Sequence, residues 1–344
     1  MAERPRAESP VLDTVRGQAT AVETLKRALR GDRVHHACLF DGPDGVGKER
    51  AAFGLAQALV CETRAAGTAD ACGRCGACRR AVPAAGEARP THPDVTVIER
   101  GLYDPAVLGR RSPETQDISI DQIRTLVLAR AAFAPTEGRA KVFLVRRAEE
   151  LSAAAANSLL KTLEEPGPRT HFVLLSAVAD SLLPTIRSRV QRVRFGPLGD
   201  AIVVDLLVER GIDRDRATEL ARLGAGSMSA ALAFADPDAT EKREDLAQRA
   251  MAALRAQNLA GALEVAEEAK KLGKEPFAAV LEAFATSLAA SVRSAVLGIG
   301  GATGRDVETG AARYSLILAA MRELEMNASV QLATEAMFIK MRGS

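Results

Sequence analysis

The sequence predicts an α/β nucleotide-binding layer with a parallel sheet, followed by helices alone. Three observations lead to this fold class. A short apolar strand, a glycine-rich turn and a helix follow one another in residues 37–60. Continuous apolar runs at 141–145 and 171–176 are typical of strands buried in a parallel sheet, and a helical pattern lies between them. After Pro197 the strand pattern stops, which is the order of an α/β layer followed by helical modules.

Four of the strands are predicted from short apolar runs, and the last from the segment RVRF at 192–195. The predicted strands are 37–40, 95–98, 141–145, 171–176 and 192–195. The strand at 95–98 lies within residues 83–117, which carry many Pro, Gly and charged residues and are otherwise expected to form surface loop.

The helices are predicted from apolar spacing and from capping residues. Residues 1–35 end in a helix, and a second helix runs from about 49 to 60. Ser119 and Gln122 form a capping box for a helix that reaches about residue 132. Ser152 begins a further helix, which Pro166 ends.

Three domains are expected from the change in pattern along the chain. Residues 1–196 form the nucleotide-binding-like domain. Residues 197–240 form a small helical domain with a turn at Gly226–Ser227. Residues 241–344 form Ala-rich amphipathic helices that a glycine-rich loop at 298–304 interrupts.

Composition is that of a globular protein. Of the 344 residues, 47% are hydrophobic and 26% are charged, which excludes wholesale disorder. No apolar run of about 18 residues predicts a membrane span, and the N-terminus lacks the apolar stretch of a signal peptide. We therefore expect a cytoplasmic protein. Aromatic residues are only 3% and Trp is absent, which argues against a base-stacking surface for single-stranded nucleic acid.

The net charge of +2 hides an asymmetry. Residues 1–196 carry 29 basic and 23 acidic side chains, and the rest of the chain carries 17 and 21. The basic excess of the first part is compatible with a polyanion such as a nucleotide or DNA, but it is too small to establish one.

Residues 42–48 match the pattern G-x-x-x-x-G-K of a phosphate-binding loop. Gly42, Gly45 and Gly47 would let backbone N–H groups face phosphate oxygens, and Lys48 would reach the β and γ phosphates. The next residue is Glu49 in place of the hydroxyl residue that ligates Mg²⁺. At about 4 Å and an effective dielectric constant of about 20, like charges repel by about 4 kcal/mol. We therefore expect ATP or ADP to bind weakly or not at all.

The strand at 141–145 should carry the acidic residues that hold Mg²⁺ and activate water. It ends instead in Arg146 and Arg147, and the nearest carboxylate is Glu149. Two cations cannot hold Mg²⁺, so the chain is expected to have no ATPase activity of its own. The alternative, that the catalytic strand lies elsewhere, stays open.

Four of the five cysteines lie close together in the sequence, at Cys61, Cys72, Cys75 and Cys78. Two overlapping C-x-x-C turns can present three thiolates to one point, and Cys61 can complete a tetrahedron. Four cysteine ligands with no open position are typical of a structural zinc site. A redox C-x-x-C pair needs only two cysteines. Cys38, within a strand, is expected to be a small buried apolar residue.

Arg187 and Arg189 alternate with small residues between the strand at 171–176 and the end of the first domain. A solvated edge is the ordinary interpretation of such a pattern. An arginine at a subunit face could instead stabilise transition-state charge on the γ-phosphate of a neighbouring subunit.

Residues 156–166 (ANSLLKTLEEP) resemble the NxLLKxLEEP segment of bacterial clamp-loader ATPase-like subunits. The resemblance spans about residues 11–235, and the tail at 241–344 is similar only in length and character. The other matching features follow the family's order: Gly17-Gln18, His35-His36-Ala37, the glycine-rich loop, the four cysteines and Ser188-Arg189.

Two branches of this family have the cysteine module. The gamma/tau motor branch keeps a GK[ST] loop and an acidic strand end, whereas the delta-prime branch is near this length and often has an impaired nucleotide site. Glu49, Arg146 and Arg147 favour the delta-prime branch of the DNA polymerase III clamp loader. Two further segments resemble this branch, His92-Pro93-Asp94 and residues 117–124. The chain also departs from the motor pattern in two places: Ser188-Arg189-Val190 replaces Ser-Arg-Cys, and Ser229 stands where motor subunits place an Arg.

The resemblance implies an AAA+ module with a zinc-binding insertion, a helical lid at 197–240 and a helical collar at 241–344. The chain would be a non-hydrolysing stator in a five-membered ring that places the sliding clamp on primed DNA. Its partners would be gamma/tau motor subunits, a delta subunit, the clamp and DNA, with no membrane. Arg189, with Ser188, would serve as an arginine finger at a neighbour's ATP site, and Lys48 would be a relic or a weak phosphate contact.

Two alternatives remain. In the first, the chain is an active gamma/tau-like ATPase motor in which Lys48 binds phosphate and Glu49 or Glu149 holds Mg²⁺. In the second, it is a zinc-ribbon nucleic-acid adaptor with an ATPase-like shell, although its low aromatic content and small net charge oppose this function.

Overall fold

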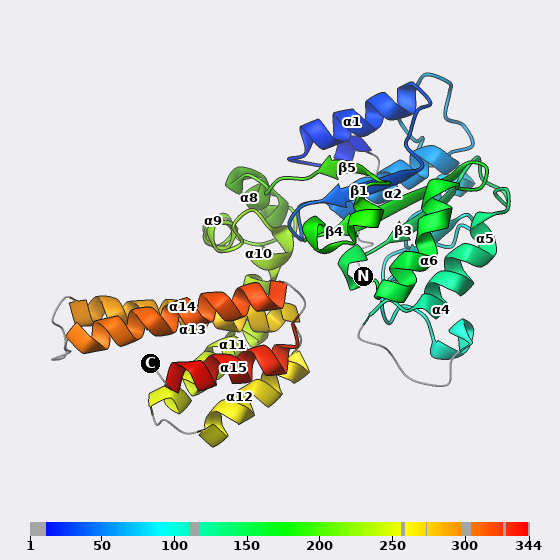
Figure 1. The fold of residues 1–344 in the computed structure, drawn as a ribbon. Helices are drawn as coiled ribbons and strands as arrows, with labels where there is room; N and C mark the ends of the chain where they lie inside the picture. Colours follow the sequence, from blue (N-terminus) through cyan, green and yellow to red (C-terminus); the bar gives the residue numbers. More distant parts are fainter. Residues whose placement is uncertain are drawn as a thin grey trace. The chain divides into compact units, whose positions relative to one another are not determined.

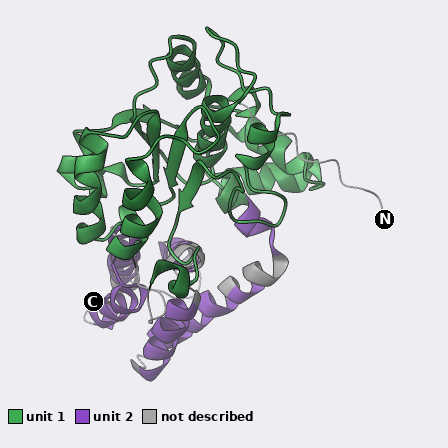
Figure 2. Cartoon of the chain, turned by 90° about the vertical axis from the view of Figure 1, so that its right-hand side faces the viewer, with its two compact units in different colours: residues 1–231 green, residues 232–344 purple. Residues whose placement is uncertain are grey.

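The computed structural model describes residues 12–109, 117–255, 259–272, 274–296, 304–325 and 328–342. The chain divides into two compact units, residues 1–231 and 232–344, and each is described by itself (Figure 2). The division into 1–196, 197–240 and 241–344 stays a prediction. Its second boundary falls inside one helix, Pro237–Arg255.

The first unit is built on a five-stranded parallel sheet with the order β2-β3-β4-β1-β5 (Figure 1). All strands therefore end at one edge. The central strands β3, β4 and β1 pair with neighbours on both sides, and their apolar side chains pack above and below the sheet. The strands are β1 (Ala37–Asp41), β2 (Val95–Ile98), β3 (Lys141–Val145), β4 (Thr170–Ser176) and β5 (Gln191–Arg194).

Helices cover both faces of this sheet. One face contributes Phe143 and Phe172, which stack at 5.2 Å, to a core that also contains Leu159 and Val127 from the helices between strands. Strand residues that alternate with these point to the opposite face of the sheet. Almost every residue of α2, the helix after β1, is buried. The helices of this region are α1 (Ala19–Arg30), α2 (Lys48–Val60), α3 (Gly76–Arg80), α4 (Ile120–Ile123), α5 (Ala129–Ala131), α6 (Ala153–Glu164) and α7 (Pro184–Arg187).

The capping residues act as the sequence predicts. Ser119 and Gln122 form both bonds of the capping box at α4, and the Ser152 hydroxyl accepts from the Ala155 N–H at the start of α6. The helix predicted to reach residue 132 is not uniform, because a π-helical segment, Arg124–Leu128, separates α4 from α5. Short 3₁₀ turns lie at Leu12–Thr14, Pro105–Leu108, Ala148–Glu150 and Ala179–Ser181.

After β5, the residues that the structure describes form helices and no strand. Three short ones come first, α8 (Asp200–Val208), α9 (Arg214–Leu223) and α10 (Met228–Ala235). The second unit contains α11 (Pro237–Arg255), α12 (Leu259–Leu272), α13 (Lys274–Val296), α14 (Gly304–Glu325) and α15 (Val330–Arg342). Phe277, Phe284, Ile317 and Phe338 lie in its core. Most of the predicted loop at 298–304 lies outside the described residues.

The α/β class with a parallel sheet and an all-helical C-terminal part is thus confirmed. Within the described ranges, no helix is long and apolar enough to cross a membrane.

Candidate functional site

The glycine-rich loop joins β1 to α2, as a phosphate-binding loop requires (Figure 1). Gly42 begins it, and Gly47 is the N-cap of α2 with φ of 100°, a left-handed conformation that glycine adopts readily. Gly45 has φ of 72°, and a Cβ there would lie 2.4 Å from the backbone nitrogen of Ser229. The loop therefore has the expected geometry, and its outer side is in close contact with the chain around residue 229.

The Lys48 ammonium is directed into its own loop. It donates to the carbonyl oxygen of Gly42, to that of Pro43 at 2.7 Å, and to the Asp44 carboxylate at 3.3 Å. Its side chain is only 7% exposed. Since an ammonium has three N–H groups, these contacts satisfy it without a phosphate.

The segment before α10 covers the loop. The N–H of Met228 donates to the Gly45 carbonyl at 3.1 Å, and the Ser227 hydroxyl donates to the Asp44 carbonyl at 2.8 Å. The Ser227 and Ser229 hydroxyl oxygens lie 3.1 Å apart. Ser229, which stands where motor subunits place an arginine, therefore brings a hydroxyl and no positive charge to the loop.

An ion-pair cluster joins the end of β3 to the start of α2. Arg146, at the end of β3, pairs with Glu49 of α2 and with Glu99, whose carboxylate lies 2.7 Å from Nη1. The Arg146 side chain is 16% exposed, and although burial opposes it, the two carboxylates raise the pKa of Arg146. Both carboxylates are thus engaged by one guanidinium, which offsets half of their negative charge and occupies oxygens that a metal would need.

The other residues after β3 are also engaged elsewhere. Arg147 has φ of 47° and pairs with Glu150 at 3.4 Å. The Glu149 carboxylate accepts from the Ala177 N–H at 3.3 Å. The Glu149 side chain is thus engaged by the backbone of the segment that follows β4.

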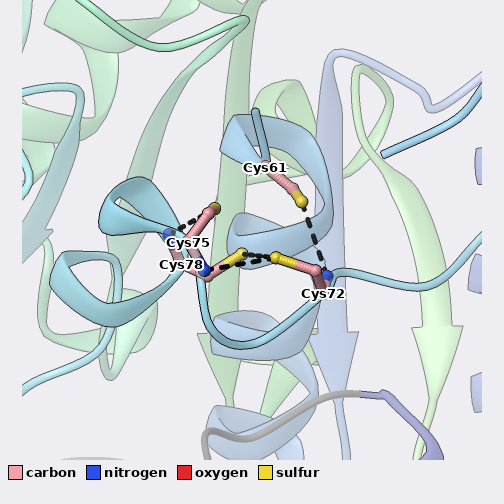
Figure 3. Close-up of side chains that lie close together, drawn as sticks. All are labelled: Cys61, Cys72, Cys75 and Cys78. Atoms are coloured by element: carbon pink, nitrogen blue, oxygen red, sulfur yellow. Dashed lines mark hydrogen bonds between the residues drawn. The ribbon is translucent and has the colours of Figure 1, made fainter. Parts of the chain in front are cut away.

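The four clustered cysteines come together at the end of α2 and the start of α3 (Figure 3). Their Sγ atoms all lie within 4.8 Å of one another, and those of Cys72 and Cys78 are 3.9 Å apart. A tetrahedral zinc with Zn–S bonds of about 2.3 Å requires sulfurs about 3.8 Å apart. The donor set and its spacing fit such an ion.

Backbone N–H groups favour thiolates in this cluster. Successive sulfurs accept from the N–H groups of Cys72, Cys75 and Cys78 at 3.3–3.4 Å. Although burial opposes it, hydrogen bonds from Thr63 and from the N–H groups of Arg74 and Cys75 lower the pKa of Cys72 to about 6. Burial raises the pKa of Cys78.

Cys38 lies apart from this cluster, in β1, and it is buried as expected. Burial raises the pKa of its thiol to about 12. Cys38 is therefore an unreactive core residue.

Arg189 follows α7, and its side chain is 32% exposed. Its Nε donates to the Glu164 carboxylate at 2.6 Å, and its Nη1 donates to the Thr185 carbonyl at 2.8 Å and to the Ser188 hydroxyl at 3.2 Å. Ser188 thus contacts the guanidinium directly. The loop before Lys48 connects β1 to α2, whereas Arg189 lies between α7 and β5.

Sequence reasoning missed the partners of these residues. Glu99 follows β2 and is not marked by its neighbours in the chain, whereas Glu164 ends α6 within the segment 156–166, which gives no sign of its contact with Arg189. Glu99 could have been found once β2 and β3 are paired, because Ile98 lies opposite Val145 in that register.

His92-Pro93-Asp94 organises the loop before β3. The buried Asp94 carboxylate accepts from the N–H groups of Thr136, Glu137 and Gly138 at 2.6, 2.9 and 2.7 Å. Although burial opposes it, these three donors lower the pKa of Asp94. The segment therefore stabilises the region where β2 and β3 begin.

The family model described as DNA polymerase III, delta subunit, matches residues 17–199, more than half of the chain. The chain belongs to this family. Its AAA+ fold class, predicted from the resemblance, agrees with the glycine-rich loop and the parallel sheet described above.

Several relatives are similar over the same region. The DNA polymerase III subunit delta' of Bacillus subtilis is 32% identical over 208 residues, 60% of this chain and 56% of the relative. The subunit delta' of Pseudomonas aeruginosa is 41% identical over 170 residues, 48% of this chain and 45% of the relative. The subunit gamma/tau of Mycobacterium tuberculosis is 31% identical over 226 residues, 64% of this chain and 36% of the relative. The chain thus spans about half the length of the delta' relatives it matches.

The prediction of a delta-prime-like member of the DNA polymerase III clamp-loader family is confirmed at this level.

Proposed function

We propose that this chain is a non-hydrolysing stator subunit of the DNA polymerase III clamp loader. The observation that carries this proposal is the Glu49–Arg146–Glu99 cluster, which puts a guanidinium where Mg²⁺ would need free carboxylates. Phosphoryl transfer depends on metal ions to neutralise developing charge. A loop whose lysine is already satisfied by its own carbonyls adds a second obstacle to nucleotide.

Arg189 is the residue we propose to act in trans. It is a partly exposed guanidinium on the connection between α7 and β5, and an arginine supplied to a neighbour's γ-phosphate stabilises the transition state there. Ser188 supports it through its hydroxyl oxygen.

We further propose that Cys61, Cys72, Cys75 and Cys78 hold a structural zinc ion. When bound, the ion supplies a cross-link between the end of α2 and the start of α3, and no chemistry. Gln57 of α2 supports the cluster, because its amide donates to the Cys78 carbonyl at 3.0 Å.

The proposed partners follow the family. They are gamma/tau motor subunits, a delta subunit, the sliding clamp and, within the complex, primed DNA. In this proposal residues 197–240 act as the lid and residues 241–344 as the collar, and the complex works in the cytoplasm.

ATP binding and hydrolysis by the purified, zinc-loaded chain test the first half of the proposal, with Lys48→Ala as control. We expect no turnover, and weak binding or none. Turnover that Lys48→Ala abolishes would instead make the chain a gamma/tau-like motor.

The second half is tested in a complex assembled with gamma/tau and delta subunits of the same organism. Arg189→Ala should lower its ATPase by about 10³-fold at the site that this chain faces, which is the low end for arginine fingers. Arg187→Ala, two residues away and paired with Asp180 at 3.0 Å, is the matched control and should leave the rate unchanged.

A further inference from the structure

Arg189 is held within its own chain. All three of its guanidinium nitrogens contact an oxygen of the same molecule: Nε and Nη2 contact the Glu164 carboxylate, and Nη1 contacts the Thr185 carbonyl and the Ser188 hydroxyl. A carboxylate on the Nε–Nη2 edge occupies the donors that bind a phosphate in the bidentate manner. In the free chain, Glu164 therefore takes the position that a phosphate would need.

The contact with Arg189 offsets an unfavourable location of the Glu164 carboxylate. Glu164 is the last residue of α6, and a negative charge at a helix C-terminus is opposed by the helix dipole. The helix gains nothing electrostatically from an acidic residue at this point. The contact with Arg189, 25 residues further along the chain, compensates for this unfavourable position.

The pair is also suited to exchange. The Glu164 side chain is 47% exposed and that of Arg189 is 32% exposed, and ion pairs so open to water change an equilibrium by a factor of only about 1.4 to 5. A nucleotide phosphate carries more negative charge than a carboxylate and accepts from the same fork of N–H groups. It can therefore displace the carboxylate without a large barrier.

We propose that Glu164 is a positioning residue that occupies Arg189 as a placeholder anion and gives way to a phosphate of the nucleotide bound by the neighbouring subunit. This inference rests on the proposed function of Arg189. Because the placeholder competes equally in the ground state and the transition state, its removal should change the apparent affinity for ATP and leave kcat unchanged.

The chain offers a matched control. Glu165 is the adjacent residue, it is exposed, and its carboxylate has the same unfavourable place at the end of α6. Within the part of the chain that the structure describes, Glu165 forms no ion pair with Arg189. Glu164→Gln and Glu165→Gln therefore remove the same charge from the same helix end, but only the first frees Arg189.

The first readout uses the isolated chain. Phenylglyoxal, a reagent for arginine, modifies Arg189, and the rate is measured on the peptide by mass spectrometry. We expect Glu164→Gln to accelerate the reaction at Arg189 about 1.4- to 5-fold, the range of an exposed ion pair, and Glu165→Gln to leave it unchanged.

The second readout uses the ATPase of the complex with gamma/tau and delta subunits. Glu164→Gln should lower the half-maximal ATP concentration about 1.4- to 5-fold at constant kcat, Glu165→Gln should not, and the effect should vanish in an Arg189→Ala background. If the two glutamine variants behave alike while ATPase still depends on Arg189, the role of Glu164 is refuted and the proposed function stands. If Arg189→Ala leaves the ATPase unchanged, the proposed function fails and this inference fails with it.

Discussion

Replacing Asp94 with Asn removes one negative charge from a buried position without changing the size of the side chain. The carboxylate accepts from three consecutive N–H groups: Oδ1 from Thr136 at 2.6 Å, and Oδ2 from Glu137 and Gly138 at 2.9 and 2.7 Å. In the variant one carboxylate oxygen becomes an NH₂ group, so at least one of these donors loses its acceptor. The new NH₂ group of the asparagine is itself buried and has no acceptor there, which costs about 1–3 kcal/mol, and the remaining bonds weaken when the charge is lost. We therefore expect Asp94→Asn to lower the free energy of unfolding by about 2–4 kcal/mol.

The assay is urea unfolding of the zinc-loaded chain at pH 7, combined with hydrogen exchange of peptides that cover residues 134–142. Asp104→Asn is the control, because Asp104 is exposed and caps a 3₁₀ turn through a single bond to the Ala106 N–H at 2.8 Å. Asn caps as well as Asp, so this variant should stay within about 0.5 kcal/mol of the wild type. A loss at Asp94 no larger than that at Asp104 would refute the reasoning.

The pH dependence of the Asp94 effect has a defined sign. Its pKa is lowered in the folded chain, so its contribution is complete above the unfolded-state pKa of about 3.9 and is lost as the pH falls through the lower folded-state value. The difference between wild type and Asp94→Asn should therefore stay constant from pH 7 to about pH 5. A difference that already disappears at pH 5 would show that the carboxylate is not stabilised as the three donors imply.

Three other predictions concern the metal and the nucleotide loop. Removing metal with a chelator should make Cys61, Cys72, Cys75 and Cys78 reactive toward a thiol reagent while Cys38 stays protected, which thiol titration and mass spectrometry of the peptides can measure. Cys72→Ser should lower zinc affinity at least about 10-fold in a competition assay with a chromogenic chelator, because a ligand contributes at least as much as an outer-shell partner. Glu49→Thr combined with Arg146→Asp should create Mg²⁺-dependent ATP binding that calorimetry can detect, whereas Arg146→Asp alone leaves Glu49 and Glu99 unpaired beside a third carboxylate and should destabilise the chain by about 1–3 kcal/mol. ATP binding by neither the double variant nor the wild type would show that Lys48 and the segment at 227–229 are enough to exclude nucleotide.

Most strands and helices of the first unit could be predicted from local sequence patterns. The candidate site could be predicted only in part. Every strand appears within one residue of its predicted bounds, and for β1, β2, β3 and β4 the reason is that a buried parallel strand needs a continuous apolar run. Ser119 and Ser152 begin helices because their hydroxyls reach N–H groups three residues ahead. These signals are local, so the sequence contains them in full.

The pairings that define the site are not local. Arg146 meets Glu49 across 97 residues and Glu99 across 47, and both contacts depend on the order of strands in the sheet. The sequence therefore shows that a cation, Arg146, stands where an acidic residue would be needed to hold Mg²⁺. It does not show which carboxylates pair with Arg146. The same holds for Asp94, whose three donors lie more than 40 residues away.

The contacts of the glycine-rich loop explain why its form can persist without metal chemistry. Gly45 must lack a side chain because Ser229 lies against it, and the loop carbonyls of Asp44 and Gly45 accept from Ser227 and Met228. Gln18 adds a third connection, since its amide bonds the carbonyls of Val46 and Gly196 at 3.2 and 2.7 Å. The loop thus holds the segments at 196 and 227–229 in place. A substitution at Gly45 would disturb these contacts even in a chain that never binds ATP, so the motif alone says little about nucleotide. The proposed stator role rests instead on Glu49, Arg146 and Ser229, of which Glu49 and Arg146 take no part in shaping the backbone of the loop.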